Sequence, residues 1–361
     1  MNYQSWTGCL DPKFGYGAML DGFVANTPKT VTFDPKASVN VYMSVPHTAG
    51  GWWEGQHRVL FSMWETDKLP NRFIRWLGQY DQVLVPCNHN VELFSQHHNN
   101  VSHVPLGVDR TFWKPEPQTR TGNFRFHAGG SLWMRKGLDV VVRAFNNLRL
   151  PDAELHIKAA PHAKDTPVKG FGSNIVMHRN WMSLEMQRTW FLEGDVFIAA
   201  SRGEGFGLMP LQAISLGIPT IVSTTTGQEQ FAHLATGVVS CGKSPAETIG
   251  QWDEPNQGEL EELMMDHYRN WADRKDQAVV NAKGADQFSW KKAVNKLLAA
   301  VPTGTALSTD TWVQHDVIMP VTLHRNLNCD IGKHSYSFRK GVTYDVPENV
   351  YLVLKEARML V

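Results

Sequence analysis

The chain has 361 residues, of which 42% are hydrophobic and 19% are charged. This balance is that of an ordinary globular protein with room for two domains, which excludes a single small module and a disordered or fibrous chain. Lys and Arg together number 35, as do Asp and Glu, so the formal net charge is zero. The protein as a whole therefore has no electrostatic attraction to nucleic acid or to an anionic membrane.

Cysteine spacing and the start of the chain indicate a reducing compartment. The four cysteines, at positions 9, 87, 241 and 329, lie far apart without a CxxC pair, which does not favour a disulfide framework or a zinc knuckle. The first residues lack the basic stretch and apolar run of a signal peptide, and no window reaches the roughly 18 apolar residues of a membrane span. We therefore expect a cytoplasmic protein without a membrane span.

Short β-branched runs alternate with helical patterns from the start of the chain. The runs are TVTF (30–33), NVYMSV (40–45), RVLFSMW (58–64), QVLVP (82–86) and VSHVPL (101–106). Such alternation predicts a parallel sheet with crossover helices. A helix is predicted within LPNRFIRWLGQY, where Pro70 stands at a position that a first helical turn tolerates.

A second alternating series follows residues 114–122, KPEPQTRTG, whose composition indicates a linker. Strands are predicted in FRFHAGG, AELHIKAA, DVFIAAS and PTIVST, and helices in RKGLDVVVRAFNNL, SLEMQRTWFLEG and MPLQAISLG. Two successive sets of strands and helices joined by a linker predict an α/β protein with two lobes.

The C-terminal part changes pattern twice. ELEELMMDHYRNWADRKDQAVVNAKGADQ and SWKKAVNKLLAAV are amphipathic helices that we expect to brace the lobes. Beyond the linker-like VPTGTALSTD, the short apolar runs VIMPVTL, YSF, VTYDVP and VYLVL predict a small β-rich module. The predicted domains are residues 1–117, 118–302 and 303–361.

The segment DVFIAASRGEGFGLMPLQAISLGIPTIVS, residues 195–223, carries the strongest chemical signal. An apolar strand runs into a glycine-rich turn with one carboxylate, Glu204, and a helix begins near Leu208. Such a turn points the main-chain N–H groups of Phe206, Gly207 and Leu208 outward, where the helix dipole favours a diphosphate. The glycines flanking Glu204 allow a ligand to approach the main chain, and Glu204 is then placed to accept hydrogen bonds from a sugar.

This segment resembles the retaining glycosyltransferases of family 4, members of the GT-B superfamily, whose signature is EGFG-x-P-x-x-E-A-x-x-x-G-x-P. The matching residues are Glu204, Gly205, Phe206, Gly207, Pro210, Ala213, Gly217 and Pro219. The resemblance implies the GT-B fold, in which two Rossmann-like domains face a cleft and the second binds a nucleotide-sugar donor. Gln212 stands where the family has a second glutamate on the donor ribose; an amide still bonds hydroxyls, which implies an altered nucleotide preference.

A second stretch, FHAGGSLWMRKGLDVVVRAF at 126–145, resembles the family's strand, glycine loop and Lys-Gly helix start. The resemblance implies that Lys136 meets the donor diphosphate near Gly129 and Gly130. Because Gly130 replaces an arginine usual in the family, we expect Arg135 to supply the second positive charge. Two cations facing a leaving diphosphate stabilise the charge that develops as the glycosidic bond breaks. Taken alone, RKG is also a common solvated pair.

Further resemblances lie in the first half. Residues 60–115 resemble a family-4 branch with a W-E-T-x-x-L-P pattern and a G-V-D-x-x-F-x-P lobe junction. Glu65 then ends a strand facing the cleft, where it orients the acceptor or stabilises the forming cation; a helix cap is the alternative. Gly15 and Gly17 in FGYGAMLDGF resemble the glycine-rich first loop near the donor phosphates. His47 is either the family's histidine near the sugar or a plain loop histidine.

The resemblance implies transfer of a sugar from a nucleotide-sugar donor to an acceptor with retention of configuration. No metal and no cofactor are expected, and the nucleotide sugar is a co-substrate. The C-terminal module resembles small bacteriophage modules, so the candidate acceptors are a virion protein, a surface glycan and a modified DNA base, with the host cytoplasm as the location of a phage-encoded enzyme. Two alternatives stay open: a non-catalytic nucleotide-sugar-binding protein, which Gln212 favours, and a nucleotide-sugar epimerase of GT-B shape.

Overall fold

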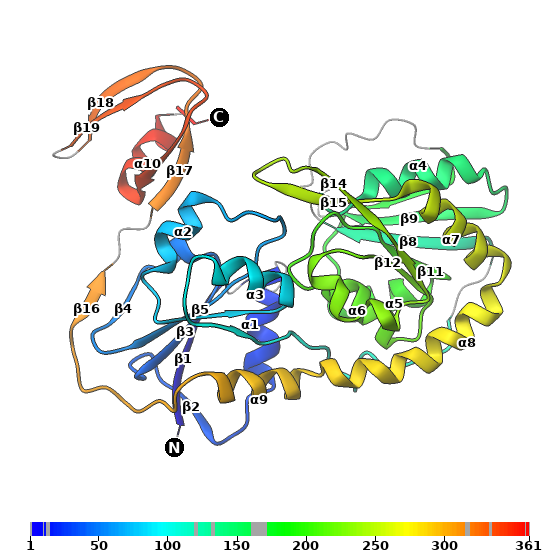
Figure 1. Ribbon diagram of the computed structural model, residues 1–361, viewed down its shortest axis with the longest axis horizontal. Helices are drawn as coiled ribbons and strands as arrows, with labels where there is room; N and C mark the ends of the chain where they lie inside the picture. Colours follow the sequence, from blue (N-terminus) through cyan, green and yellow to red (C-terminus); the bar gives the residue numbers. More distant parts are fainter. Residues whose placement is uncertain are drawn as a thin grey trace.

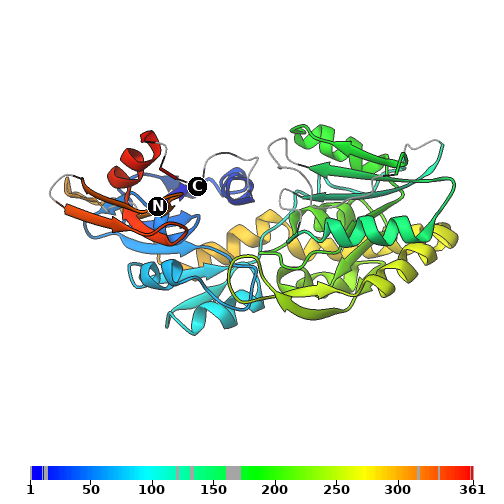
Figure 2. The same cartoon turned by 90° about the horizontal axis from the view of Figure 1, so that it is seen from above.

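Two α/β lobes lie side by side, and a small C-terminal module lies on the first of them (Figure 1). The computed structural model describes residues 2–9, 11, 15–118, 122–130, 134–159, 172–314, 318–331, 334–357 and 359–360. The view from above shows the same division, with the module and first lobe at one end and the second lobe at the other (Figure 2). None of the described helices combines the length and the apolar character that crossing a bilayer requires.

The first lobe is built on a six-stranded sheet in which all neighbouring strands are parallel, as the alternating runs predict. Its strands, in spatial order, are β2 (Val31–Phe33), β1 (Asn2–Gly8), β3 (Val39–Met43), β5 (His57–Phe61), β6 (Gln82–Val85) and β7 (Val101–His103). The helices α2 (Asn71–Leu77) and α3 (Asn88–Ser95) bury apolar side chains against one face, and α1 (Gly15–Ala25) against the other. The segment of β1 was not predicted as a strand because its sequence, NYQSWTG, is mostly polar.

The second lobe repeats this design with the strand order that Rossmann folds use. Its parallel strands, in spatial order, are β10 (Ile175–His178), β9 (Ala153–Ala159), β8 (Phe124–Gly130), β11 (Val196–Ala199), β12 (Thr220–Ser223) and β13 (Gly237–Val239). The helices are α4 (Leu138–Leu148), α5 (Leu184–Leu192), α6 (Leu208–Ser215) and α7 (Gln257–Arg269). The chain order reverses between β8 and β11, and ligands of such sheets bind outside the strands' carboxyl ends at this point.

After the second lobe the chain returns to the first. Helix α8 (Trp271–Asn281) and the 3₁₀ helix η4 (Ala282–Phe288) lead to α9 (Trp290–Ala300), which packs against α1. The rings of Phe23 and Trp290 lie 5.3 Å apart, and a Cβ atom on Gly22 would collide with Trp290. The predicted bracing helix α9 therefore belongs by its contacts to the first lobe, although we placed it within residues 118–302.

The C-terminal module has a small core of its own, formed by residues such as Val321, Phe338 and Leu354. Two antiparallel pairs supply its strands: β17 (Ile318–Thr322) with β20 (Thr343–Pro347), and β18 (Leu327–Ile331) with β19 (His334–Phe338). The run VYLVL, which we predicted as part of a β-rich pattern, is helical and lies in α10 (Glu348–Glu356). Val350 and Leu354 are four residues apart and both buried, which is helical spacing.

Several contacts attach the segment after α9 to the first lobe, among them a strand pair and an ion pair. The strand β16 (Trp312–Gln314) pairs with β4 (Gly51–Trp53), and Asp345 of β20 forms an ion pair with Arg75 of α2 at 3.4 Å. Residues 303–314 thus run along the first lobe before the module begins.

Candidate functional site

The candidate site lies where β8 and β11 end, at the reversal of strand order in the second sheet. A Cβ atom on Gly137 would lie 1.8 Å from the carbonyl oxygen of Ala200, and Gly137 has a φ of +63°. Only glycine combines this left-handed conformation with so close an approach. The contact brings the start of α4 against the turn that follows β11, and so places Lys136 beside Glu204.

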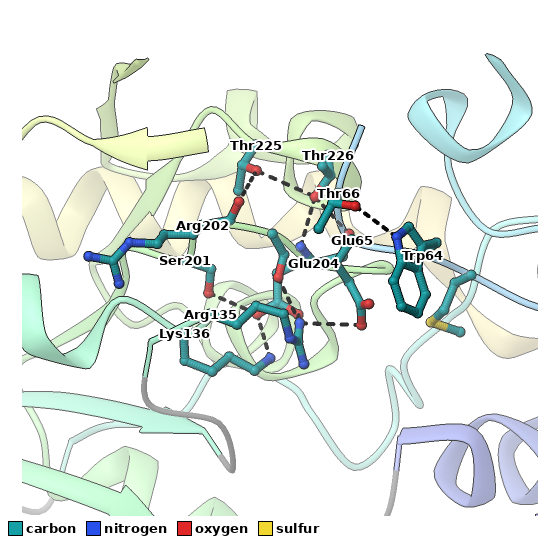
Figure 3. A network of polar contacts seen from close by, with 12 residues as sticks. Trp64, Glu65, Thr66, Arg135, Lys136, Ser201, Arg202, Glu204, Thr225 and Thr226 are labelled. Carbon is teal, nitrogen blue, oxygen red and sulfur yellow. Dashed lines mark hydrogen bonds and ion pairs between the residues drawn. The ribbon is translucent and has the colours of Figure 1, made fainter. Parts of the chain in front are cut away.

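Glu204 is a buried carboxylate with several polar partners in its own lobe (Figure 3). Its Oε1 atom lies 2.5 Å from Nζ of Lys136 and accepts a hydrogen bond of 2.9 Å from the Ser201 hydroxyl. Its main-chain N–H donates to Oγ1 of Thr226 at 2.8 Å. The side chain and the main chain of Glu204 are therefore both fixed in place.

The charges of this cluster stabilise one another. Burial acts to raise the pKa of Glu204, but the positive charges of Lys136 and Arg135 outweigh it and hold that pKa below its ordinary value. Burial lowers the pKa of Lys136, and Glu204 opposes that shift. We infer that the pair is ionised at neutral pH, because each charge has the other as a partner within hydrogen-bond distance.

Arg135 joins the two lobes. Its Nη1 atom lies 3.4 Å from Oε1 of Glu65 and 3.7 Å from Oε2 of Glu204, and it donates to the carbonyl oxygen of Gly203 at 2.7 Å. We predicted Glu65 at the end of a strand, but β5 ends at Phe61 and Glu65 lies in the loop that follows. That loop crosses to the second lobe, which is why a first-lobe carboxylate reaches Arg135.

Tyr16 of α1 holds the same loop from the other side. Its hydroxyl lies 3.0 Å from Oγ of Ser62 and accepts a hydrogen bond of 3.2 Å from the main-chain N–H of Met63. Burial raises the pKa of Tyr16 far above its ordinary value, so the hydroxyl stays protonated. Sequence reasoning missed this residue, although it stands between the two glycines of the first-loop pattern.

Two glycines of the turn, Gly203 and Gly205, pack against the first-lobe loop and do not face open space. Cβ atoms on Gly203 and Gly205 would lie 2.2 Å from the Glu65 carbonyl oxygen and 2.1 Å from Sδ of Met63. We expected these positions to admit a ligand to the main chain. In this structure the first-lobe loop makes that close approach, because the two lobes meet at the turn.

The start of α6 is the part of the turn that keeps its donors free. Gly207, with a φ of +100°, precedes the first helical residue, Leu208. Among the described residues, none accepts a hydrogen bond from the main-chain N–H groups of Gly207 or Leu208. The same holds for the main-chain N–H of Phe206, whose side chain packs into the core between Phe231 and Phe288 at ring distances of 5.8 and 6.2 Å.

Gln212, on α6, is paired with a second amide. Its Oε1 accepts a hydrogen bond of 2.7 Å from Nε2 of Gln187 on α5. Gly129 and Gly130 end β8 and make room for neighbours: a Cβ atom on Gly130 would lie 2.4 Å from Cγ of Lys136, and one on Gly129 would lie 2.8 Å from Cε of Met209.

Three predicted residues of the first lobe lie outside the charged cluster. Gly15 and Gly17 were expected in a loop, but both lie in the first turn of α1, where helical geometry replaces the open loop. His47 lies in the 3₁₀ helix η1 (Pro46–Thr48), with its ring 6.0 Å from that of Phe73. Its Nδ1 atom has no hydrogen-bond partner among the described residues, and burial lowers its pKa.

Arg202 holds the turn that carries Glu204 in place, and sequence reasoning also missed this residue. Its guanidinium binds both carboxylate oxygens of Asp139 at 2.7 and 2.8 Å and both of Glu254 at 2.7 and 2.5 Å. Its main-chain N–H donates to the carbonyl oxygen of Arg135 at 2.7 Å. The side chain is almost fully buried, so its four charge-assisted bonds fix the turn relative to α4 and to strand β15 (Gln251–Pro255).

The described histidines of the second lobe form no metal site. Within the described ranges, no group of three or more His, Cys, Asp or Glu side chains is arranged to hold a metal ion. His127 of β8 is instead buried, with its ring stacked on Trp190 at 4.3 Å and on His156 at 5.3 Å.

Two Rossmann-like sheets in lobes that meet at the charged cluster are the architecture of the GT-B fold. Solved structures share this fold: Anabaena Alr3699/HepE in complex with UDP-glucose matches with a TM-score of 0.63 and 10% identity over 83% of this chain and 100% of that one. The sucrose-phosphate synthase of Thermosynechococcus elongatus matches with a TM-score of 0.54 and 12% identity over 81% and 71%. The GT-B fold expected from the sequence is confirmed.

The sequence comparisons match a family model and individual proteins. Residues 124–251 match the family described as Glycosyl transferases group 1. The D-inositol 3-phosphate glycosyltransferase of Arthrobacter sp. (strain FB24) is 28% identical over 223 residues, 56% of this chain and 50% of that protein. The mannosyltransferase LpsB of Rhizobium meliloti (strain 1021), of lipopolysaccharide core biosynthesis, is 46% identical over 48 residues, 13% of each chain. The chain spans about half the length of the first of these relatives.

Proposed function

We propose that the chain is a glycosyltransferase that moves a sugar from a nucleotide-sugar donor to an acceptor with retention of configuration. The observation that carries the proposal is the meeting of Lys136, Arg135 and Glu204 at the point where the second sheet reverses its strand order. Positive charge and free main-chain donors at such a point suit a diphosphate, and the adjacent carboxylate suits sugar hydroxyls.

In the proposed reaction the donor diphosphate binds against the N–H groups of Gly207 and Leu208. Lys136 and Arg135 stabilise the negative charge that develops on the departing phosphate as the glycosidic bond breaks. A phosphate oxygen takes the proton of the acceptor hydroxyl, whose oxygen bonds to the anomeric carbon on the face that the phosphate leaves. Glu204 positions the sugar by accepting hydrogen bonds from its hydroxyls. The two cations and the helix N–H groups neutralise the charge of the diphosphate, so the proposed reaction needs no metal ion.

The other predicted residues have supporting parts in the proposal. Gln212, held by Gln187, binds the donor ribose, and Glu65 orients the acceptor. Support for this reading comes from relatives that are glycosyltransferases, from HepE, solved with UDP-glucose, and from a trehalose-6-phosphate synthase studied for glycosyl transfer with retention, which matches with a TM-score of 0.60. The acceptor candidates stay a virion protein, a surface glycan and a modified DNA base, with bacteriophage origin and the host cytoplasm as parts of the same proposal.

The test is release of nucleoside diphosphate from a panel of nucleotide sugars, with and without candidate acceptors. We expect the wild-type protein to release nucleoside diphosphate slowly from one donor, and Lys136→Ala and Glu204→Ala to abolish the release. Lys291→Ala and Glu262→Gln, at exposed positions on α9 and α7, are matched controls that should keep it.

Other outcomes identify the rival functions. Binding of a nucleotide sugar without release of its diphosphate would favour a binding protein. Conversion of the free donor into its epimer without an acceptor would favour an epimerase. Full activity of both alanine variants would remove the site assignment.

A further inference from the structure

The charged cluster is already neutral before any ligand binds. Lys136 and Arg135 carry two positive charges, and Glu204 and Glu65 carry two negative charges. Without Glu65, the three charged side chains of the second lobe would leave one positive charge in excess. The first lobe therefore supplies the carboxylate that completes the balance, and Figure 3 shows Glu65 pointing at Arg135 from the loop that also carries Trp64 and Thr66.

Arg135 has further N–H donors on the same guanidinium besides the one at Nη1. Its polar contacts with the described residues all involve Nη1, and none of these residues accepts a hydrogen bond from its Nε or Nη2 atoms. The Arg135 side chain is 16% exposed. A planar guanidinium binds the oxygens of a phosphate as readily as those of a carboxylate, so Arg135 is able to exchange one anion for the other.

The loop that brings Glu65 also has a contact that involves no cation of the cluster. The Oδ1 atom of Asp67 accepts a hydrogen bond of 2.6 Å from the main-chain N–H of Gln251, and the N–H of Asp67 donates to the Gln251 carbonyl oxygen at 3.3 Å. Asp67 lies two residues from Glu65 and carries the same charge. It therefore separates the effect of a charge on Arg135 from the effect of loosening the contact between the lobes.

We infer that Glu65 occupies the place of the donor's diphosphate on Arg135 and is displaced when the donor binds. This inference rests on the proposed function, because it takes Arg135 as a phosphate ligand. A diphosphate and the Glu65 carboxylate repel each other at one guanidinium, so the two anions compete. Displacement breaks the 3.4 Å ion pair between Glu65 and Arg135, which joins the lobes. The Glu65 side chain is then able to turn toward the acceptor.

The competition is measured as the affinity of nucleoside diphosphates for wild-type and variant protein by titration calorimetry. The probes are UDP, GDP and ADP, and the diphosphate that binds the wild type is used throughout. Glu65→Gln keeps the shape of the side chain and removes its charge. We expect it to bind the diphosphate about tenfold more tightly, the order expected when a like charge near a part-buried ligand is removed.

Two controls make the result specific. Asp67→Asn, which removes a negative charge from the same loop without freeing Arg135, should leave the affinity within about twofold of the wild-type value. Glu65→Gln should increase the affinity for the corresponding nucleoside monophosphate less than the affinity for the diphosphate, because the monophosphate places fewer charges beside Arg135.

The outcomes separate this inference from the proposed function. Binding of a diphosphate by the wild type with no gain, or a loss, in Glu65→Gln would overturn the inference and leave the proposed function standing. An equal gain in Asp67→Asn would also overturn it, since loosening of the lobes would then explain the effect. Binding of none of the three diphosphates by wild type and Glu65→Gln alike would overturn both.

Discussion

The carbonyl oxygen of Ala200 lies 1.8 Å from the point where a Cβ atom of Gly137 would stand. Because Gly137 also has a φ of +63°, Gly137→Ala should combine a collision with a strained backbone and lower the free energy of unfolding by at least about 1–2 kcal/mol. Chemical denaturation measures the change. Gly242→Ala is the control, because the position has open space and no positive φ; equal stability losses in the two variants would contradict the role of this contact.

The Lys136–Glu204 pair should behave as a coupled unit in stability as well as in binding. Lys136→Met leaves a buried carboxylate without its nearest cation, which should cost about 3 kcal/mol and raise the pKa of Glu204. Glu204→Gln in the same protein should restore part of the loss, because no unpaired charge then remains. Urea unfolding of the two single variants and the double variant gives the coupling energy, and strictly additive changes would contradict the pairing.

Arg202 should matter for stability more than any exposed arginine near it. Arg202→Met leaves Asp139 and Glu254 without their buried partner and should cost about 3–5 kcal/mol. Arg143→Met removes a half-exposed partner of the same Asp139 and should cost about 1 kcal/mol or less. Hydrogen exchange should speed up in residues 251–255 of the Arg202 variant only, and unchanged exchange there would show that Arg202 does not hold β15.

A buried histidine on α7 should make the protein sensitive to acid. Burial lowers the pKa of His267 to about 4, and its ring lies 2.8 Å from Oγ1 of Thr236. The folded state keeps this ring neutral while the unfolded chain takes up a proton below about pH 6.5. Stability from His267 is thus complete above about pH 6.5 and is lost as the pH falls to 4, by about 3 kcal/mol.

The measurement compares unfolding free energies of the wild type and His267→Gln between pH 7 and pH 4. The variant should be less stable at pH 7, and its unfolding free energy should fall less steeply as the pH is lowered. Some pH dependence should remain, because burial also lowers the pKa of His127. Parallel pH profiles for the two proteins would rule out the contribution of His267.

The turn after β11 was predictable because its signals are local. An apolar run, a glycine-rich turn and a helix start follow one another within residues 195–215, and each depends only on neighbours in the chain. The same holds for β8, whose predicted and observed bounds agree. The strand prediction for the last apolar run of the C-terminal module was wrong, because a short apolar run does not distinguish a strand from a buried helix.

Residues that act through distant partners left no such local signal. Gln212 is identifiable from its place in the motif, but its bond to Gln187 joins two helices. Gly205 looked like a site of ligand approach, whereas Met63 of the other lobe lies against it. Arg202 lies two residues before Glu204, where the motif begins, but the two carboxylates that it binds come from residues 139 and 254.

The amino-acid sequence by itself determined the two sets of parallel strands, the turn that carries Glu204 and the basic pair before α4, because period, glycine and charge act over a few neighbouring residues. Only the tertiary structure decided that Lys136 meets Glu204 across 68 residues, that α9 returns to the first lobe, and that Glu65 reaches Arg135 from the opposite lobe. These contacts depend on how the sheets and loops pack together in space, and nothing in the spacing of residues along the chain specifies that packing.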